Sequence, residues 1–236
     1  MRTSFLVLVA GVLSLSSAVL HADLIAYEGF AYPAGDLIPE GSGGTGWTNS
    51  WQAGHNTVQD PGLTLAALKS TGGSLQTTNS DWASTRQITS SLGEKTGVYY
   101  ISFLIRNDTG ITDDNYGLVS FDQVISGADK PSFSIGQANF GKKWAIIAPV
   151  EARSAVDCGN MNVTILVIKV TWSGDGNDKV QLFVNPAPNA QPAKPDAEIT
   201  GVKLPPFNQV GLQSKKPFSY DELRIGTTWG DVCPAP

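Results

Sequence analysis

Short runs of β-branched and aromatic residues recur along the chain, separated by Gly, Asn, Asp, Ser and Pro. Such runs between turn-forming residues are typical of β-strands. No long segment places apolar residues at i, i+3, i+4 and i+7, so amphipathic helices are not expected. Strands are predicted over Leu24–Phe30, Leu63–Leu65, Ala83–Ile88, Gly97–Arg106, Tyr116–Phe121, Ser132–Ile135, Lys143–Ile147, Val163–Trp172, Lys179–Val184, Gln209–Gln213 and Tyr220–Ile225.

One pair of these runs carries a strong hairpin signal. Gly174–Asp178, with the sequence GDGND, joins Val163–Trp172 to Lys179–Val184, and turn residues between two apolar runs favour a hairpin. The proline-rich segment 185–195 cannot be a central strand, because proline donates no ladder hydrogen bond. Many short strands with frequent turns indicate an all-β sandwich or barrel.

The N-terminus has the pattern of a secretory signal peptide. Arg2 precedes an uncharged apolar run, Phe5–Leu20, and small residues follow it at Ala22. The run is shorter than the roughly 20 residues that span a bilayer. We therefore expect residues 1–22 to be removed, residues 23–236 to form one domain, and the protein to be secreted, extracellular or periplasmic. No later apolar run is long enough to span a membrane.

Charge and histidine content narrow the classes of function. Removing residues 1–22 takes away Arg2 and no acidic residue, so the formal charge goes from −5 to −6. An acidic chain without basic clusters argues against nucleic acid as a partner. His21 leaves with the signal peptide, so His55 would be the one remaining histidine, and a histidine-based triad is not expected.

Two cysteines, Cys158 and Cys233, lie far apart in the sequence. In an exported protein an even count permits one disulfide, and Cys233 lies just beyond the last predicted strand. We expect the two to pair, with two free thiols as the alternative. Their spacing, without histidines nearby, does not indicate a zinc site.

Glycine- and acid-rich segments suggest ligand sites, each with a simpler explanation. Gly41–Gly46 matches GxGxxG, but no helix pattern follows it, so a glycine-rich loop explains it better than a dinucleotide site. The acidic turns offer oxygen ligands for Ca²⁺ but lack the EF-hand spacing, and ordinary solvated turns remain the alternative. No cofactor is expected other than calcium at these turns, with Asp113, Asp114, Asp175 and Asp178 as the candidate ligands.

The segment FSYDELRIG near the C-terminus holds two adjacent carboxylates, Asp221 and Glu222. On a regular strand they would face opposite sides, whereas Glu222 and Arg224 would share one face and form an exposed ion pair. The E-x-D-x-x-E pattern of sandwich glucanases does not occur. No catalytic residue is therefore assigned.

Six tryptophans supply large aromatic surfaces that suit either core packing or stacking on sugar rings. Trp144 and Trp172 lie in apolar runs and are predicted to be in the core. Trp47, Trp51 and Trp82 lie among Gly, Thr, Asn and Ser, so they are the candidates for exposed carbohydrate contacts. For each of the three, packing within the fold is favoured over contact with a ligand.

Several segments together resemble a group of exported bacterial proteins. They are Leu24–Gly35, the Gly43–Trp47 loop, Leu182–Pro186 and Asp221–Trp229. Many proteins of that group carry a PEP-CTERM sorting tail, which this chain lacks. Their domain is similar to the concanavalin A-like lectin/glucanase and laminin G-like jelly rolls. The resemblance implies a two-sheet antiparallel jelly roll, with the first and last strands in the same sheet.

These observations lead to a function hypothesis with two alternatives. The first is an exported, non-catalytic module that binds extracellular or cell-surface glycan. The second is a structural or adhesive matrix protein that binds no sugar. The third is a polysaccharide lyase or glycoside hydrolase, since Glu222-Leu-Arg224 matches a strand of alginate-lyase-type sandwiches, although the Gln-x-His strand of those enzymes is missing.

Overall fold

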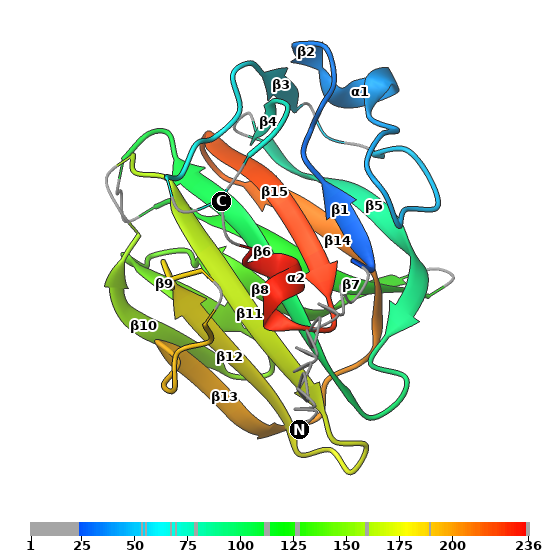
Figure 1. Cartoon of the computed structure of the whole chain (residues 1–236), viewed down its shortest axis with the longest axis vertical. Helices are drawn as coiled ribbons and strands as arrows, with labels where there is room; N and C mark the ends of the chain where they lie inside the picture. The colour runs from blue at the N-terminus through cyan, green and yellow to red at the C-terminus, as the bar shows by residue number, and fades with distance from the viewer. Residues whose placement is uncertain are drawn as a thin grey trace, which may run out of the picture.

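The fold is described from a computed structural model of the chain (Figure 1). It describes residues 24–234 except 53, 55, 67, 69, 78–79, 111–113, 126–127, 159–160 and 189. For residues 39–40, 80–82, 123–125 and 128–131 it describes the backbone alone. The predicted signal peptide therefore lies outside the described residues.

One sheet contains nine strands, and every pair in it is antiparallel. The order is β13-β12-β11-β6-β15-β4-β3-β2, and β1 also pairs with β15. The bounds are β1 Ala26–Glu28, β2 Gly35–Asp36, β3 Thr57–Gln59, β4 Ser74–Thr77, β6 Gly97–Asn107, β11 Thr164–Trp172, β12 Asp178–Val184, β13 Ala197–Val202 and β15 Phe218–Gly226. The first and last strands therefore lie in the same sheet, as the resemblance implies.

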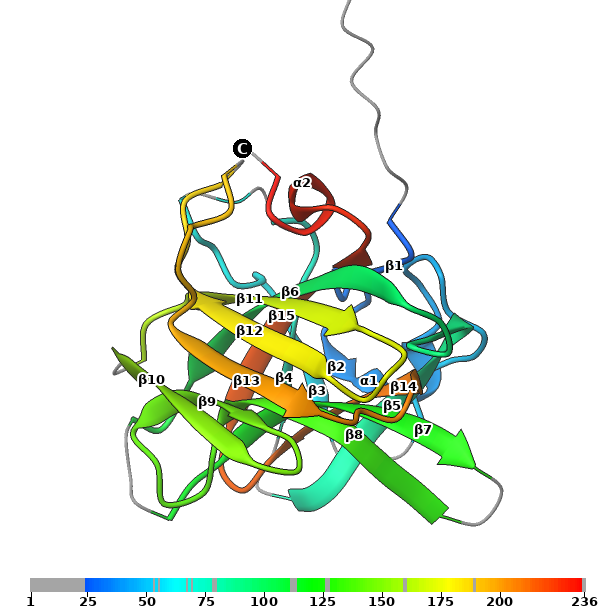
Figure 2. The ribbon, with the colours of Figure 1, turned by 90° about the horizontal axis from the view of Figure 1, so that it is seen from below.

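The second sheet contains six antiparallel strands in the order β10-β9-β8-β7-β14-β5. Its strands are β5 Ser80–Leu92, β7 Gly117–Ile125, β8 Ala128–Gln137, β9 Lys143–Ile147, β10 Glu151–Asp157 and β14 Phe207–Ser214. Seen from below, the two sheets lie face to face (Figure 2). The predicted all-β, two-sheet antiparallel sandwich is confirmed.

The inter-sheet core follows from strand alternation. Leu166, Ile168 and Val170 of β11 point inward, and they face aromatic side chains of the six-stranded sheet. Among those, the rings of Phe121 and Phe133 stack with centroids 4.7 Å apart. Burying such side chains is the main term that stabilises a sandwich. Trp144 and Trp172 are buried in this core, as predicted.

The outer face of the nine-stranded sheet is also apolar, because a second cluster covers it. Ile165 and Val167, the alternate residues of β11, belong to this cluster, together with the segment from Leu63 to Leu68. The short helix α2, Trp229–Val232, adds its two buried side chains. Burial on both faces explains why the run 163–170 reads as almost continuously apolar. The other helix, α1, spans Leu37–Glu40.

The cysteines do not pair, so the disulfide expectation is wrong. Both are free and buried. Cys158 packs in the inter-sheet core, whereas Cys233 packs in the cluster on the outer face of the nine-stranded sheet. The sheet itself lies between the two positions.

Most predicted strands are present, but some observed strands were not predicted. The strands without a counterpart in the prediction are β2, β3, β4, β10 and β13. Leu63–Leu65 is not a strand but part of the segment that covers the nine-stranded sheet. The 174–178 turn does join β11 to β12, and the proline-rich segment that follows β12 contains no strand. Neither helix of the described residues is long and apolar enough to cross a bilayer.

Candidate functional site

The adjacent carboxylates of β15 lie on the same side of the strand, so the expected opposition is wrong. The pairing register between β15 and β6 shifts between Asp221 and Arg224, and Glu222 has φ +52°. This β-bulge places two residues opposite one on the partner strand. Tyr220 and Leu223 both enter the inter-sheet core, so the two carboxylates between them lie towards the outer face.

Both carboxylates are fully buried and hold the covering segment against the strand. Asp221 Oδ2 accepts the Leu63 N–H at 2.9 Å, and Glu222 Oε1 accepts the Thr71 N–H at 2.7 Å. Burial, together with the charges of Glu222 and Glu28, raises the pKa of Asp221 to about 8. Each acid thus holds a backbone N–H of the covering segment inside the fold.

The predicted Glu222–Arg224 ion pair is confirmed, but it is not exposed. The Glu222 side chain is 0% exposed and the Arg224 side chain 12%. Glu222 also accepts the hydroxyl of Tyr27 at 3.0 Å, and the Arg224 guanidinium lies 5.1 Å from the Tyr27 ring centroid. The pair is therefore part of a packed network that joins β1 to β15.

Two of the three tryptophan candidates, Trp47 and Trp51, pack within the fold. Trp51 is 1% exposed, and its indole Nε1 donates to Glu28 Oε2 at 3.0 Å. Trp47 is half-buried and donates to the Tyr27 carbonyl at 2.9 Å. The Arg86 guanidinium lies over both rings. The expected exposure of Trp51 is therefore wrong, and the side chain of Trp82 lies outside the described residues.

The acidic side chains of the candidate calcium turns are engaged in hydrogen bonds and an ion pair within the protein. Asp114 pairs with Lys215 at 2.5 Å, and the Asp113 position is not described. Asp175 Oδ1 accepts the Ser173 hydroxyl at 2.5 Å, and Asp178 Oδ1 accepts the Ser173 N–H at 2.8 Å. Within the described part of the chain no three His, Cys, Asp or Glu side chains group as a metal site would require. His55 lies outside it.

The outer face of the six-stranded sheet carries a row of small residues. Val119 and Phe121 point inward, so Ser120 between them points outward. Ser120 pairs with Gly211 of β14 on one side and with Ser134 of β8 on the other. A Cβ on Gly211 would lie 2.5 Å from Ser120 Oγ. The small side chains therefore leave a shallow depression, which we call the trough.

Further small residues extend the trough, and longer polar side chains border it. Gly136 and Ala145 pair across β8 and β9 in the next row. On the other side Gln209 pairs with both Gln87 and Asp122. Asp122 accepts the Ser120 hydroxyl at 2.9 Å. Ser120, Ser134, Asp122 and Gln209 are buried and form the floor of the trough, whereas Gln87 is partly exposed at its border.

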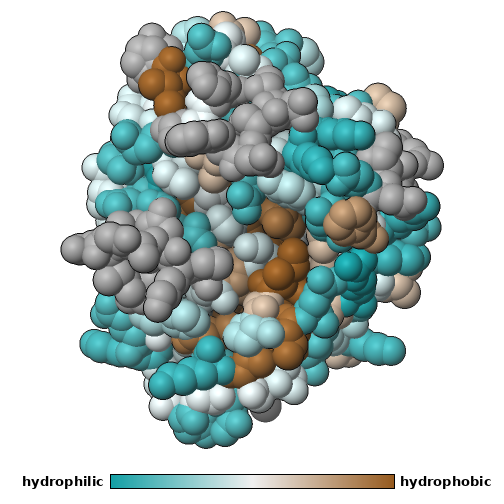
Figure 3. Space-filling view, turned by 180° about the vertical axis from the view of Figure 1, so that it is seen from behind, coloured by the Kyte–Doolittle hydropathy of each residue, from teal (hydrophilic) through white to brown (hydrophobic). Residues whose placement is uncertain are grey.

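Figure 3 looks onto this face, where an apolar band runs from the middle into the lower half between hydrophilic margins. Leu118 and Ile147 are outward apolar residues of β7 and β9. At one end the trough meets a pocket of about 340 Å³. Its lining includes Ser132, Ser134, Ile147, Ala148, Lys203 and Pro205. The Ser132 hydroxyl donates to the Pro205 carbonyl at 2.6 Å and fixes the pocket wall.

No protein-family model matches the sequence, and no curated protein matches it significantly. Solved structures do match. The endo-β-1,4-glucuronan lyase of the fungus Trichoderma reesei has a TM-score of 0.57 and 15% identity, over 85% of this chain and 97% of that chain. The chain has a concanavalin A-like fold.

Two further structures match at lower scores. The cellulose-induced protein Cip1 has a TM-score of 0.46 and 12% identity, over 75% of this chain and 87% of that one. The alginate lyase Aly36B, in complex with an alginate tetrasaccharide, has a TM-score of 0.41 and 11% identity, over 86% and 96%. At these identities the likeness concerns the fold, and function has to be argued from the residues of this chain.

Proposed function

We propose that this chain is an exported, non-catalytic module that binds polysaccharide along the trough. The observation that carries the proposal is the row of Gly211, Ser120 and Ser134. It leaves a polar depression on the one sheet face that no apolar cluster of the described residues covers. A binding site commonly combines apolar surface with a few convergent polar groups.

The chemistry of the trough suits a sugar chain. Sugar hydroxyls both donate and accept hydrogen bonds, and the amide of the partly exposed Gln87 can do the same. The Asp122 carboxylate accepts only, and it already holds the Ser120 hydroxyl. Leu118 and Ile147 supply apolar contact for the C–H surfaces of a sugar ring. The glucuronan and alginate lyases act on polysaccharides, as their names state, and this supports the choice of ligand class.

Export and the lack of catalysis remain part of the proposal. The signal-peptide pattern of residues 1–22 supports export, as does the resemblance to exported bacterial proteins. Asp221 and Glu222, which a glycosidase mechanism would need exposed to substrate, are buried under the segment that contains Leu63 and Thr71. This burial supports binding without bond cleavage.

The test is affinity electrophoresis of the mature chain in gels that contain hydroxyethyl cellulose, alginate or glucuronan. We expect at least one polymer to retard the protein. Gln87→Ala should weaken retardation about fivefold, as expected for loss of a hydrogen bond of roughly 1 kcal/mol. Gln59→Ala, an exposed glutamine on β3 of the other sheet, is the matched control and should behave as wild type.

Three outcomes would count against the proposal. Migration unchanged in every polymer would contradict polysaccharide binding by this chain. Equal losses in Gln87→Ala and Gln59→Ala would contradict the trough as its location. New reducing ends or unsaturated products, released from any of the polymers by the pure protein, would contradict a non-catalytic role and favour the lyase alternative.

A further inference from the structure

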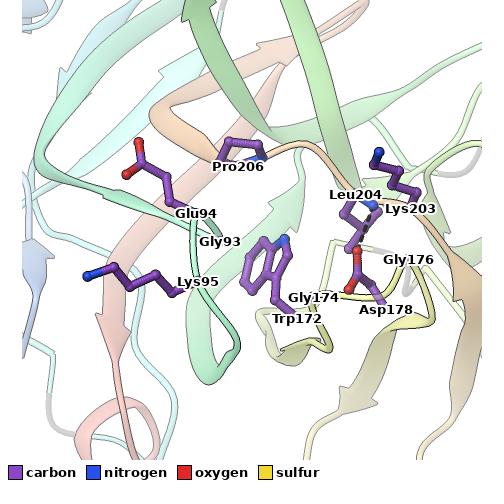
Figure 4. A pocket seen from close by; sticks show the side chains of 10 residues that line it. All are labelled: Gly93, Glu94, Lys95, Trp172, Gly174, Gly176, Asp178, Lys203, Leu204 and Pro206. Atoms are coloured by element: carbon purple, nitrogen blue, oxygen red, sulfur yellow. Dashed lines mark hydrogen bonds between the residues drawn. The ribbon is translucent and has the colours of Figure 1, made fainter.

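A second pocket lies at the end of the sandwich, beyond the segment 203–206 (Figure 4). Its volume is about 350 Å³, within the range of small-molecule sites. Three connections meet there: the turn between β5 and β6, the turn between β11 and β12, and the link from β13 to β14. We call it the Trp172 pocket, and its lining includes Glu94, Lys95, Trp172, Asp178, Lys203 and Pro206.

Trp172 presents an unused hydrogen-bond donor at this pocket. The residue is 3% exposed, and its ring packs against Tyr99 and Phe207 with centroid distances of 5.6 and 6.0 Å. Its indole Nε1 is buried and has no acceptor. An unsatisfied buried donor costs about 1–3 kcal/mol. In Figure 4 this nitrogen lies on the side of the ring that faces Pro206 and Leu204.

Gly93 keeps the space beside that nitrogen free of side-chain atoms. A Cβ at this position would lie 2.5 Å from Nε1 and 2.4 Å from the ring carbon Cε2. Its φ of +91° is a conformation that favours glycine. Any other residue here would press its Cβ against the face of the indole ring.

Two exposed lysines of the pocket can bind an anion. The Asp178 carboxylate holds the pocket wall together, because Oδ1 accepts the Ser173 N–H and hydroxyl and Oδ2 accepts the Leu204 N–H. Lys95 and Lys203 are exposed on opposite sides of the pocket, and no carboxylate of the described residues pairs with either. Glu94 is exposed beside Lys95. Together with Asp178 the lining holds two acidic and two basic side chains, so an anion would be met by the ammonium groups of Lys95 and Lys203 themselves and not by an excess of positive charge.

We propose that the Trp172 pocket binds a small ligand that carries a carboxylate, such as a sugar acid. The carboxylate accepts the Trp172 Nε1–H, and Lys95 and Lys203 balance its charge. The ring edge of Trp172, Leu204 and Pro206 provide apolar contact for the rest of the ligand. The site shares Lys203 with the pocket at the end of the trough, but Trp172 and Lys95 line only the Trp172 pocket, so binding there does not depend on polysaccharide in the trough.

The test follows the indole N–H resonances of the ¹⁵N-labelled protein by NMR. Trp172→Phe identifies the Trp172 resonance by its loss. We expect sodium glucuronate to shift this resonance saturably, and glucose, of similar size but uncharged, to leave it in place at equal ionic strength. Lys95→Gln should weaken glucuronate binding about two- to fivefold, as expected for an exposed charge.

The control is Lys194→Gln, which removes the same charge from the exposed loop after β12 and should bind as wild type. Lys95→Gln does not touch the core, so it remains informative even where Trp172→Phe folds poorly. The absence of a saturable shift with glucuronate would overturn the proposal. An equal shift with glucose, or equal binding by Lys95→Gln and wild type, would overturn the role of the carboxylate.

Discussion

Glu28 of β1 and Arg86 of β5 form a buried ion pair that links the two sheets, with Oε2 and Nη1 2.5 Å apart. The two side chains are 1% and 3% exposed. Glu28 also accepts the Phe30 N–H at 2.9 Å and the Tyr32 hydroxyl at 2.6 Å. Its carboxylate therefore has several donors in place of water, which a buried charge requires.

Removing one partner of this pair should destabilise the domain strongly. Glu28→Ala leaves the Arg86 guanidinium buried without its counter-charge, and we expect a loss of about 3–5 kcal/mol in the free energy of unfolding. Urea denaturation followed by circular dichroism measures it. The matched control is Glu151→Ala, whose partner Arg153 is 38% exposed. This control should cost about 1 kcal/mol or less, and equal losses in the two variants would contradict a special role for the inter-sheet pair.

Glu222→Gln should also be costly, in contrast to the exposed pair expected from the sequence. Its carboxylate is fully buried and accepts from Tyr27, Thr71 and Arg224. Weakening charged hydrogen bonds of this kind costs about 1.5–3 kcal/mol. A Glu222→Gln melting temperature within error of wild type would show that the network of Glu222 adds no stability.

Ile225→Asp places an unpaired carboxylate in the inter-sheet core and should prevent folding.

The sandwich could be predicted because most strands carry their own pattern. The apolar run 163–172 and the turn residues 174–178 predict a hairpin from local sequence alone. In the structure β11 and β12 form this hairpin. β10, with the sequence EARSAVD, is an edge strand that is exposed along most of its length, so selection for apolar alternation is weak there. The β10 strand therefore leaves no clear signal in the sequence.

The bulge at Glu222 could not be predicted, because no turn residue marks it. A non-glycine residue with positive φ is uncommon. One extra residue in a strand moves the side chains on one side of the bulge to the opposite face of the sheet from that expected by simple alternation. Trp47 and Trp51 sit among polar neighbours, yet they cover Arg86 from a distant strand. The trough, in contrast, had a signal: Ser120 and Ser134 each stand between two core residues.

The two free thiols should behave as buried groups. Burial, with the nearby Asp157 charge, raises the pKa of Cys158 to about 12, and burial raises that of Cys233. The reactive thiolate is therefore scarce at neutral pH. We expect slow alkylation by iodoacetamide in buffer, complete alkylation of both in urea, and a melting temperature that a reducing agent leaves unchanged. An intact mass two hydrogens lighter than the reduced chain would instead reveal a disulfide.

Asp221 should make the stability of the domain depend on pH. Its pKa is raised from 3.8 to about 8 in the folded protein, first by burial and then by Glu222. Between these values the folded state binds about one more proton than the unfolded state. The free energy of unfolding should therefore fall by about 1.4 kcal/mol per pH unit as the pH rises from about 4 to 8. Below about pH 4 and above about pH 8 the titration of Asp221 should no longer change the free energy of unfolding.

Asp221→Asn resembles the protonated acid and removes this titration, so the difference between the wild-type and variant curves isolates it. Urea melts at pH 4.5, 6 and 7.5 measure the difference, which should shift in favour of the variant as the pH rises. Asp175→Asn is the control, because hydrogen bonds from Ser173 and Asn177 lower the pKa of Asp175 to about 2. The stabilising effect of the Asp175 carboxylate is lost only as the pH falls below about 4. The free energy of unfolding of Asp175→Asn should therefore run parallel to that of wild type over the tested pH range. A constant difference between wild type and Asp221→Asn would mean that Asp221 is ionised in the folded protein throughout.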